Sequence, residues 1–379
     1  MRKYLLLPML SCFFTLTICA CAYADAKEEL HENVIAQLVS LFENETELRA
    51  KFVYGFIKQP ESSPWYGRGI EDFYSFFANW LKFNPRIETA KKYIDEFKMF
   101  YTLPEHRGSI PEAREAVIDE KFAEWLKLFV VARGEYLKSS ESKSIVKEWA
   151  EENAVAIGQC EIPKGGFSSF NDFFTRRLAP GVRPIYAKDD RSSLVSPADC
   201  NVWRDSKWLE SDSDIRVKGD SYDLVALLGD EQVSKKYRNG SALTCMLMPD
   251  NYHRFHAPVS GLVTYRKDMD GLYFGSKGFF DYFYERTRSV VELKMDNGKH
   301  VAIASIGIAT ISSVSIFKDV GDTVGKGEEL GMFEYGGSAM VLLFEPNSLQ
   351  SVVFDDIPSE YEVRGTNFMM GQLLGKLNK

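Results

Sequence analysis

The sequence predicts an α+β fold, with an N-terminal helical domain packed on an antiparallel β-rich, barrel-like catalytic domain. The first observation is glycine content, because residues 27–150 hold five glycines and residues 151–379 hold twenty-two. The second is a change of periodicity, from apolar residues at helical spacing to short apolar runs separated by Gly, Asp and Asn. We therefore expect a helical domain over 27–155 and a catalytic domain over 160–379, packed together because no low-complexity linker separates them.

The helical half is predicted from stripes of apolar residues three and four positions apart. Such stripes run from Val34 to Phe42, from Phe73 to Leu81 and from Phe122 to Val130. This spacing places the apolar side chains on one face of each helix. It predicts four to six amphipathic helices whose aromatic stripes form a core, in preference to a cofactor site or a membrane surface.

The second half is predicted to be mainly β-structure. Its apolar runs are rich in Val, Ile, Thr and Tyr, and the clearest of them cover 241–247, 261–265, 290–295, 301–308 and 339–344. Asp296-Asn297-Gly298 lies between two of these runs and predicts a hairpin turn.

The first 24 residues are typical of a secretory signal peptide. Arg2 and Lys3 precede an apolar run from Leu5 to Cys19, and Ala22-Tyr23-Ala24 places small residues before the cleavage point. Export to the periplasm or the exterior is therefore expected. Two alternatives stay open, an uncleaved membrane anchor and lipoprotein processing at Cys21.

Composition excludes several classes of protein. Hydrophobic residues make up 45% and charged residues 26%, which is unlike disordered, collagen or coiled-coil chains. The net charge of −8 without a long Lys/Arg run predicts no nucleic-acid partner.

Beyond the leader the cysteines are Cys160, Cys200 and Cys245, an odd and widely spaced set, so we expect free buried thiols.

Histidine is the first candidate for chemistry. Two of the five histidines, His253 and His256, lie three residues apart just before Pro258. Imidazole is the side chain that carries protons near neutral pH. A zinc site would need a third ligand, and no Cys/His/Glu cluster accompanies the pair, so no metal is expected.

An acid and a hydroxyl complete a candidate catalytic set. Asp199 ends Ser196-Pro197-Ala198-Asp199, upstream of the histidines, and Ser338 lies in Gly336-Gly337-Ser338-Ala339, downstream of them. Asp, His and Ser can form a nucleophilic triad. The three residue types alone are weak evidence, and the Gly-x-Ser-x-Gly turn of hydrolases is missing.

The chain resembles the phosphatidylserine decarboxylase family of pyruvoyl enzymes in six ordered blocks. These blocks are Phe170 to Arg177 with Arg183-Pro184-Ile185, Val195 to Asp199, Val217-Lys218-Gly219 with Tyr222 to Gly229, Tyr252 to Pro258, Glu285 to Arg288, and Gly325 to Glu345.

The resemblance implies that the chain cleaves itself between Gly337 and Ser338, leaving two chains that stay together. Ser338 would attack the carbonyl of Gly337, with His256 as the base and Asp199 orienting His256. Ser338 would end as a pyruvoyl group, a covalent cofactor that forms a Schiff base with an amine and accepts electrons when CO₂ leaves. His253 would then protonate the carbanion.

The resemblance leaves the substrate open. Phosphatidylserine is favoured, because the blocks match that family and the aromatic loop 272–285 could hold a lipid or contact a membrane. A free aromatic L-amino acid such as tryptophan is the alternative. It is supported by the helical extension, by the lack of evident membrane-seating helices, and by Gly-Gly-Ser in place of the family's Leu-Gly-Ser-Thr, a form that resembles a soluble branch. Cys200 also replaces a common glycine of the family.

Two functions outside this enzyme class are less well supported by the sequence. The blocks around Gly261 and Gly325 are similar to a biotinyl or lipoyl carrier, but no lysine stands at the expected hairpin tip. A catalytically inactive binding homologue would be expected to have lost one of the four candidate site residues, and all four are present. The sequence therefore favours an enzyme, a carboxy-lyase.

Overall fold

The computed structural model describes residues 33–378, except 85, 87–88, 90–91, 104–107, 153–156, 205–223, 272–286, 311–313 and 355–364. The predicted signal peptide with its alternatives, the aromatic loop 272–285 and the family block at 217–222 lie outside the described residues.

Helices come first along the chain. After a helical stretch over 33–44, the helices are α2 (Thr46–Ile57), α3 (Ile70–Leu81), α4 (Lys92–Tyr101), α5 (Pro111–Val117), α6 (Glu120–Lys138), the 3₁₀ turn η2 (Ser140–Lys143), α7 (Ser144–Glu152), α9 (Phe170–Phe174), α10 (Leu224–Leu228) and α11 (Glu231–Lys235).

Local sequence explains why these helices form where they do. In α3 the residues at 70, 73, 76, 77, 80 and 81 are buried, which is one face of a helix. The carboxylate of Asp72 accepts from the backbone N–H of Gly69 at its start, and Asp119 caps α6 by accepting from the Lys121 N–H. The rings of Phe52, Phe73 and Phe122 then meet in one aromatic core, which confirms that the stripes are core residues.

Antiparallel strands follow. They are β1 (Ser193–Val195), β2 (Cys200–Arg204), β3 (Ser241–Leu247), β4 (Arg254–His256), β5 (Gly261–Met269), β6 (Arg288–Lys294), β7 (His300–Thr310), β8 (Val314–Ile316), β9 (Thr323–Val324), β10 (Glu329–Phe333), β11 (Gly336–Phe344), β12 (Leu349–Val352), β13 (Thr366–Phe368) and β14 (Leu373–Leu377).

The strands form three open sheets, so the predicted barrel is wrong for the described residues. The large sheet has the order β13-β2-β3-β11-β7-β6-β5-β9, and its edge strands β13 and β9 do not pair with each other. The smaller sheets have the orders β4-β10-β8 and β1-β14-β12. The predicted hairpin at 296–298 is confirmed, because it joins β6 to β7 with Gly298 at a φ of 81°.

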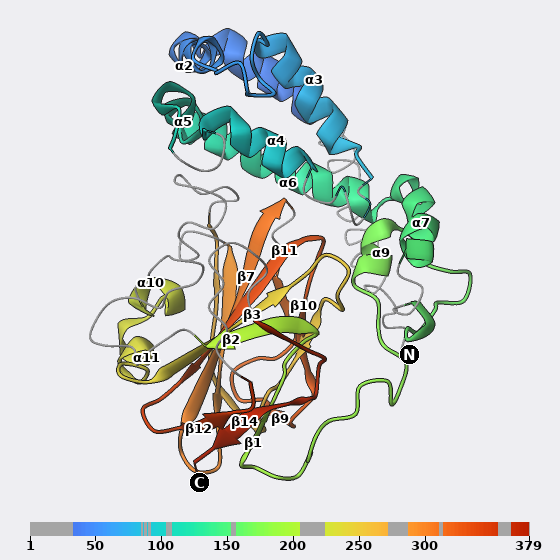
Figure 1. Cartoon of the computed structure of the whole chain (residues 1–379), viewed down its shortest axis with the longest axis vertical. Coiled ribbons are helices and arrows are strands. Elements are labelled where there is room, and N and C mark those ends of the chain that lie inside the picture. Colours follow the sequence, from blue (N-terminus) through green and yellow to red (C-terminus); the bar gives the residue numbers. More distant parts are fainter. Residues whose placement is uncertain are drawn as a thin grey trace, which may run out of the picture.

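β11 lies inside the large sheet, and its side chains alternate between two cores. Ala339, Val341 and Leu343 pack in the same cluster as the helical core, whereas Met340 and Leu342 face the core shared with the smaller sheets. Helices α2 to α6 form a layer beyond one end of the strands (Figure 1). β7 runs toward this layer, so its antiparallel neighbour β11 begins there.

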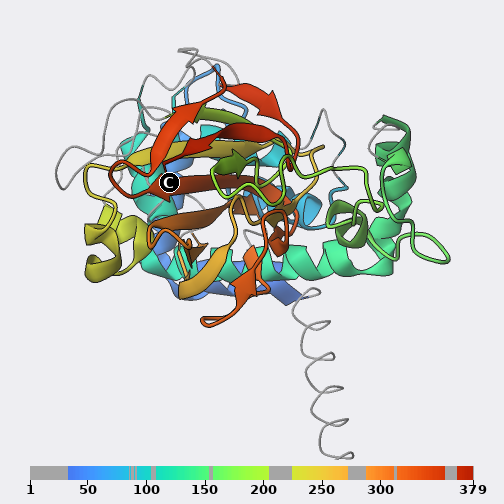
Figure 2. The ribbon, with the colours of Figure 1, turned by 90° about the horizontal axis from the view of Figure 1, so that it is seen from below.

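The shorter helices lie on opposite sides of the strands. Both views place α7 and α9 on one side and α10 and α11 on the other (Figure 2). Among the described residues, no helix combines the length and apolar character needed to cross a bilayer. Cys160, Cys200 and Cys245 are buried and form no disulfide within the described part of the chain, as predicted.

Candidate functional site

Ser338 lies at the start of β11, between Leu247 of β3 and Gly307 of β7. Its side chain is 0% exposed, and its Oγ has no hydrogen-bond partner among the described residues. Leaving a hydroxyl buried and unpaired costs about 1–3 kcal/mol, so such a group calls for an explanation. The pairing of β11 with β7 shifts register between Gly336 and Gly337, immediately before the serine. Irregularities of this kind are frequent beside active sites.

His256 is the last residue of β4 and is buried. Its Nδ1 lies 2.9 Å from the carbonyl oxygen of Gly327, and its Nε2 lies 3.0 Å from the hydroxyl of Tyr252. A carbonyl only accepts, so Nδ1 carries the hydrogen and the lone pair is on Nε2. Burial lowers the pKa of His256 below its ordinary value, against a smaller opposing effect of the Gly327 carbonyl. The ring is therefore neutral at pH 7, with a basic Nε2.

Gly327 is suited to orienting His256 because of its backbone. It has a φ of 80°, a conformation that L side chains rarely adopt. A Cβ at this position would clash with the side chain of Ile185. The orientation of His256 thus depends on the backbone carbonyl of Gly327, at a position that favours glycine.

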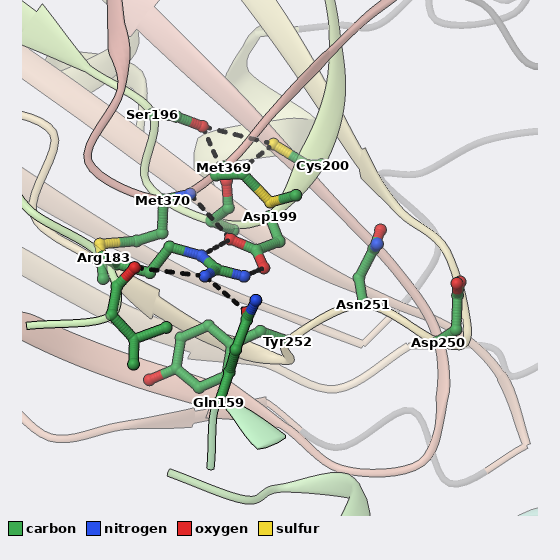
Figure 3. Close-up of polar contacts among 12 residues, drawn as sticks. Gln159, Arg183, Ser196, Asp199, Cys200, Asp250, Asn251, Tyr252, Met369 and Met370 are labelled. Atoms are coloured by element: carbon green, nitrogen blue, oxygen red, sulfur yellow. Dashed lines mark hydrogen bonds and ion pairs between the residues drawn. The ribbon is translucent and has the colours of Figure 1, made fainter. Parts of the chain in front are cut away.

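Asp199 does not contact His256, which corrects the predicted triad. Figure 3 shows its carboxylate facing the guanidinium of Arg183, with Nε–Oδ1 at 3.1 Å and Nη2–Oδ2 at 2.7 Å. The backbone N–H of Met370 adds a third hydrogen bond at 2.8 Å. Arginine's planar fork matches a carboxylate in this bidentate way, so it occupies both oxygens. The turn that carries Asp199 also reaches His256, whose backbone N–H donates to the Pro197 carbonyl at 2.8 Å, and the charge of Asp199 has a minor raising effect on the pKa of His256.

His253 is 0% exposed and its ring lies 4.0 Å, centroid to centroid, from that of Phe174. Nδ1 lies 2.9 Å from the carbonyl oxygen of Asn251, which makes it the N–H donor, and Nε2 has no partner among the described residues. Burial, with the nearby charge of Arg176, lowers the pKa of His253 to about 3. Among the described residues, His253 therefore holds a buried lone pair on Nε2 that no donor shares.

Arg176 fixes the backbone that orients His253. Its Nη2 donates to the carbonyls of Asp250 at 3.1 Å and Asn251 at 3.2 Å. The Asn251 carbonyl thus accepts from both Arg176 and His253. In the same turn, Asn251 Oδ1 accepts from the backbone N–H of Met248 at 2.8 Å, directly after the end of β3.

No hydrogen bond joins Ser338 to His253, His256 or Asp199 among the described residues, but the segments that carry Ser338 and His253 are packed together. His253 stacks on Phe174, whose ring lies 5.2 Å from that of Tyr335, three residues before Ser338. Leu247, the partner of Ser338 across the sheet, leads directly into the turn that carries the histidines. Among the described residues no group of three or more His, Cys, Asp and Glu suits a metal ion.

Sequence reasoning left three functional side chains without a role. Arg183, Arg176 and Tyr252 all lie in the motifs that carry the resemblance, yet only the structure gives their partners. A buried carboxylate such as that of Asp199 needs a cationic partner. The arginines in the same motifs were the sequence feature from which that partner could have been predicted.

The Asp199–Arg183 pair yields a stability prediction. Arg183→Met leaves a nearly buried carboxylate without its cation, since the two side chains are 7% and 11% exposed. Removing one partner of a buried ion pair costs about 3–5 kcal/mol. We expect the free energy of unfolding, measured by denaturant titration, to fall by that amount.

A matched arginine is the control for this measurement. Arg177 is 60% exposed and lies 3.8 Å from Glu329, so Arg177→Met should cost less than about 1 kcal/mol. Equal effects of the two substitutions would contradict a special role for the Asp199–Arg183 pair.

Comparison with known proteins places this site in a family. The family model for phosphatidylserine decarboxylase matches residues 170–376. A phosphatidylserine decarboxylase proenzyme of Fusobacterium nucleatum is 32% identical over 270 residues, covering 69% of this chain and 86% of that protein. The Bacillus mycoides proenzyme is 35% identical over 219 residues, covering 55% of this chain and 79% of that protein.

A third relative is much longer than this chain. Phosphatidylserine decarboxylase proenzyme 3 of Schizosaccharomyces pombe is 32% identical over 196 residues, which is 50% of this chain and 20% of that protein. The family match spans more than half of the chain and holds Asp199, His253, His256 and Ser338. The chain belongs to the phosphatidylserine decarboxylase family.

Proposed function

We propose that the chain is a carboxy-lyase that converts phosphatidylserine to phosphatidylethanolamine with a pyruvoyl group that it makes from Ser338. The observation that carries the proposal is that the buried hydroxyl of Ser338, unpaired among the described residues, lies directly after a register shift at Gly336-Gly337. Ser305 of β7 shares the unpaired hydroxyl but lies beside no such shift. Relatives named phosphatidylserine decarboxylase proenzyme support both the substrate and the processing step.

Self-cleavage uses residues of this chain alone. His256 Nε2 takes the hydroxyl proton of Ser338, and Oγ attacks the carbonyl carbon of Gly337. The C–N bond between the two residues breaks as the C–O ester bond forms. Loss of the Cα proton of residue 338 then expels the Gly337 carboxylate. Water hydrolyses the resulting enamine after its rearrangement, releasing ammonia and leaving a ketone at position 338.

The surroundings of Ser338 fit such a group. Among the described residues the Ser338 hydroxyl has no side-chain partner to lose when it is consumed, and Gly337 has no side chain to obstruct a substrate. When present, a pyruvoyl group condenses with an amine and accepts the electron pair released as CO₂ leaves.

The remaining task of the chain is to move one proton. A histidine with a pKa of about 3 is neutral at pH 7, with one proton on Nδ1 and none on Nε2. His253 Nε2 therefore first accepts a proton, and the substrate ammonium must lose one before its amine can react. The same nitrogen then returns the proton to the carbon that lost CO₂. The depressed pKa and the hydrogen bond from Nδ1 to Asn251 support this order of events.

The two products of cleavage stay together in this proposal. Residues 338–344 pair with both β3 and β7 in the middle of the large sheet, so the short chain 338–379 remains held by its neighbours. The protein would be exported and would meet its lipid substrate by peripheral contact with a membrane. A free aromatic amino acid is the second candidate substrate, favoured by the Gly-Gly-Ser sequence and by the large helical domain.

Mass spectrometry of the purified protein tests the processing step. We expect a fragment of 42 residues, 338–379, lighter by one ammonia than hydrolysis of the peptide bond would leave it. CO₂ release should then be measured from phosphatidylserine in micelles and from tryptophan, tyrosine, phenylalanine and serine. An intact chain after long incubation overturns the proposal, and turnover of free amino acids alone transfers it to the second substrate.

A further inference from the structure

The segment just before the cleavage site is held by the helical domain. Lys138, the last residue of α6, forms an ion pair of 2.9 Å with Glu334, four residues before Ser338. The Glu334 side chain is only 12% exposed, and that of Lys138 is 39% exposed. α6 ends more than thirty residues before the family match begins at residue 170, so the contact comes from outside the family's common region.

The following residue is held as well. The backbone N–H of Tyr335 donates to Asn171 Oδ1 of α9 at 3.2 Å. Its ring is buried against Phe170 and Phe174, with centroids 5.1 and 5.2 Å apart, in one cluster with Tyr136 and Leu137 of α6. Glu334 and Tyr335 thus form a fixed point made by two helices.

A fixed point here limits the motion of the reacting bond. Only Gly336 and Gly337 separate Tyr335 from Ser338, and glycine has the largest backbone freedom of any residue. On the far side Ser338 is held by its pairing with Leu247 and Gly307. Attack of a side chain on the preceding carbonyl needs a near-attack geometry, which a displacement of about 1 Å can slow 10²-fold.

We infer that Lys138 is a positioning residue for self-cleavage, through which the helical domain holds Glu334 and hence the Gly337 carbonyl within reach of Ser338. This inference rests on the proposed function. It assigns the N-terminal helices a part in the maturation of the catalytic domain. In Figure 1 the C-terminal end of α6 and α9 lie together beside the strands, as this role requires.

Charge reversal tests the inference in the full-length chain. Lys138→Glu sets two carboxylates side by side, and we expect conversion of intact chain to the 338–379 fragment to slow about tenfold, equal to about 1.4 kcal/mol in the barrier. The swap Lys138→Glu with Glu334→Lys should restore most of the rate, and Lys138→Arg should keep it. Lys127→Glu, at an exposed lysine of the same helix, is the matched control and should cleave normally.

Two further measurements separate positioning from general stability. The thermal midpoint of Lys138→Glu should stay close to that of the natural chain, and CO₂ release per cleaved molecule should be unchanged. If Lys138→Glu cleaves normally, the inference is overturned and the proposed function stands. The same holds if cleavage is slow but the charge swap fails to restore it, or if the slow cleavage accompanies a lowered thermal midpoint. A natural chain that never cleaves overturns the proposed function together with the inference.

Discussion

Ser338→Ala is expected to leave the chain intact, because it removes the oxygen that attacks Gly337. His256→Ala should slow cleavage by about 10²–10⁴-fold, the usual contribution of a general base. The Nδ1–H of His256 is fixed on Gly327, so Nε2 is the nitrogen that can accept the serine proton, once it exchanges the hydroxyl of Tyr252 for that of Ser338. Gel electrophoresis or mass spectrometry over time measures the fraction of intact chain.

Ser305 offers a control for the serine substitution. It lies on β7 in register with Met340 of β11, and its Oγ is likewise buried without a partner among the described residues. Ser305→Ala therefore removes a comparable hydroxyl close by and should leave the cleavage rate unchanged. If Ser338→Ala is still processed at the same bond, the nucleophile is misassigned.

The same base gives cleavage a pH dependence of known sign. Burial lowers the pKa of His256, so the neutral, active form persists below the ordinary value of about 6.5. Cleavage should then be constant around neutral pH and fall on the acid side once Nε2 is protonated.

Local features of the fold could be predicted from the sequence because they depend on neighbouring residues. The apolar stripe of α3 and the Asn297-Gly298 turn each specify their structure within about a dozen residues. The closure of the sheet was predicted wrongly. Whether β13 and β9 pair depends on the arrangement of eight strands, which no local pattern determines.

In the candidate site, too, residue identities could be predicted from the sequence, whereas contacts between distant residues could not. Residue types identified Ser338 and the histidines, but the expected partner of Asp199 was wrong because a carboxylate binds whichever cation the fold brings closest. Arg183, sixteen residues away, takes that place through its Nε and Nη2 groups. The ion pair between Lys138 and Glu334 spans 196 residues, and nothing in either local sequence indicates the other.

His253→Gln is expected to separate maturation from turnover. The substitution removes the lone pair of Nε2 while keeping a side chain of similar size in the buried space against Phe174. Ser338 and His256 are untouched, so the 338–379 fragment should form at close to the normal rate. Release of CO₂ per cleaved molecule should fall by about 10²–10⁴-fold, because the proposal places the proton on Nε2 of His253 between its two transfers.

A stability measurement supplies a second readout for the same variant. The folded-state pKa of about 3 lies below the unfolded value of about 6.5, so the unfolded chain binds the proton more readily between these values. The natural chain therefore loses free energy of unfolding as pH falls from about 6.5 toward 3, and His253→Gln should lose less over that window.

His300→Gln is the control for CO₂ release. His300 lies at the opposite end of β7 from Gly307, the partner of Ser338, so its substitution should leave CO₂ release unchanged. Failure of His253→Gln to cleave, with an unchanged fold, would instead place His253 in the cleavage step, and the division of labour between the two histidines would be wrong.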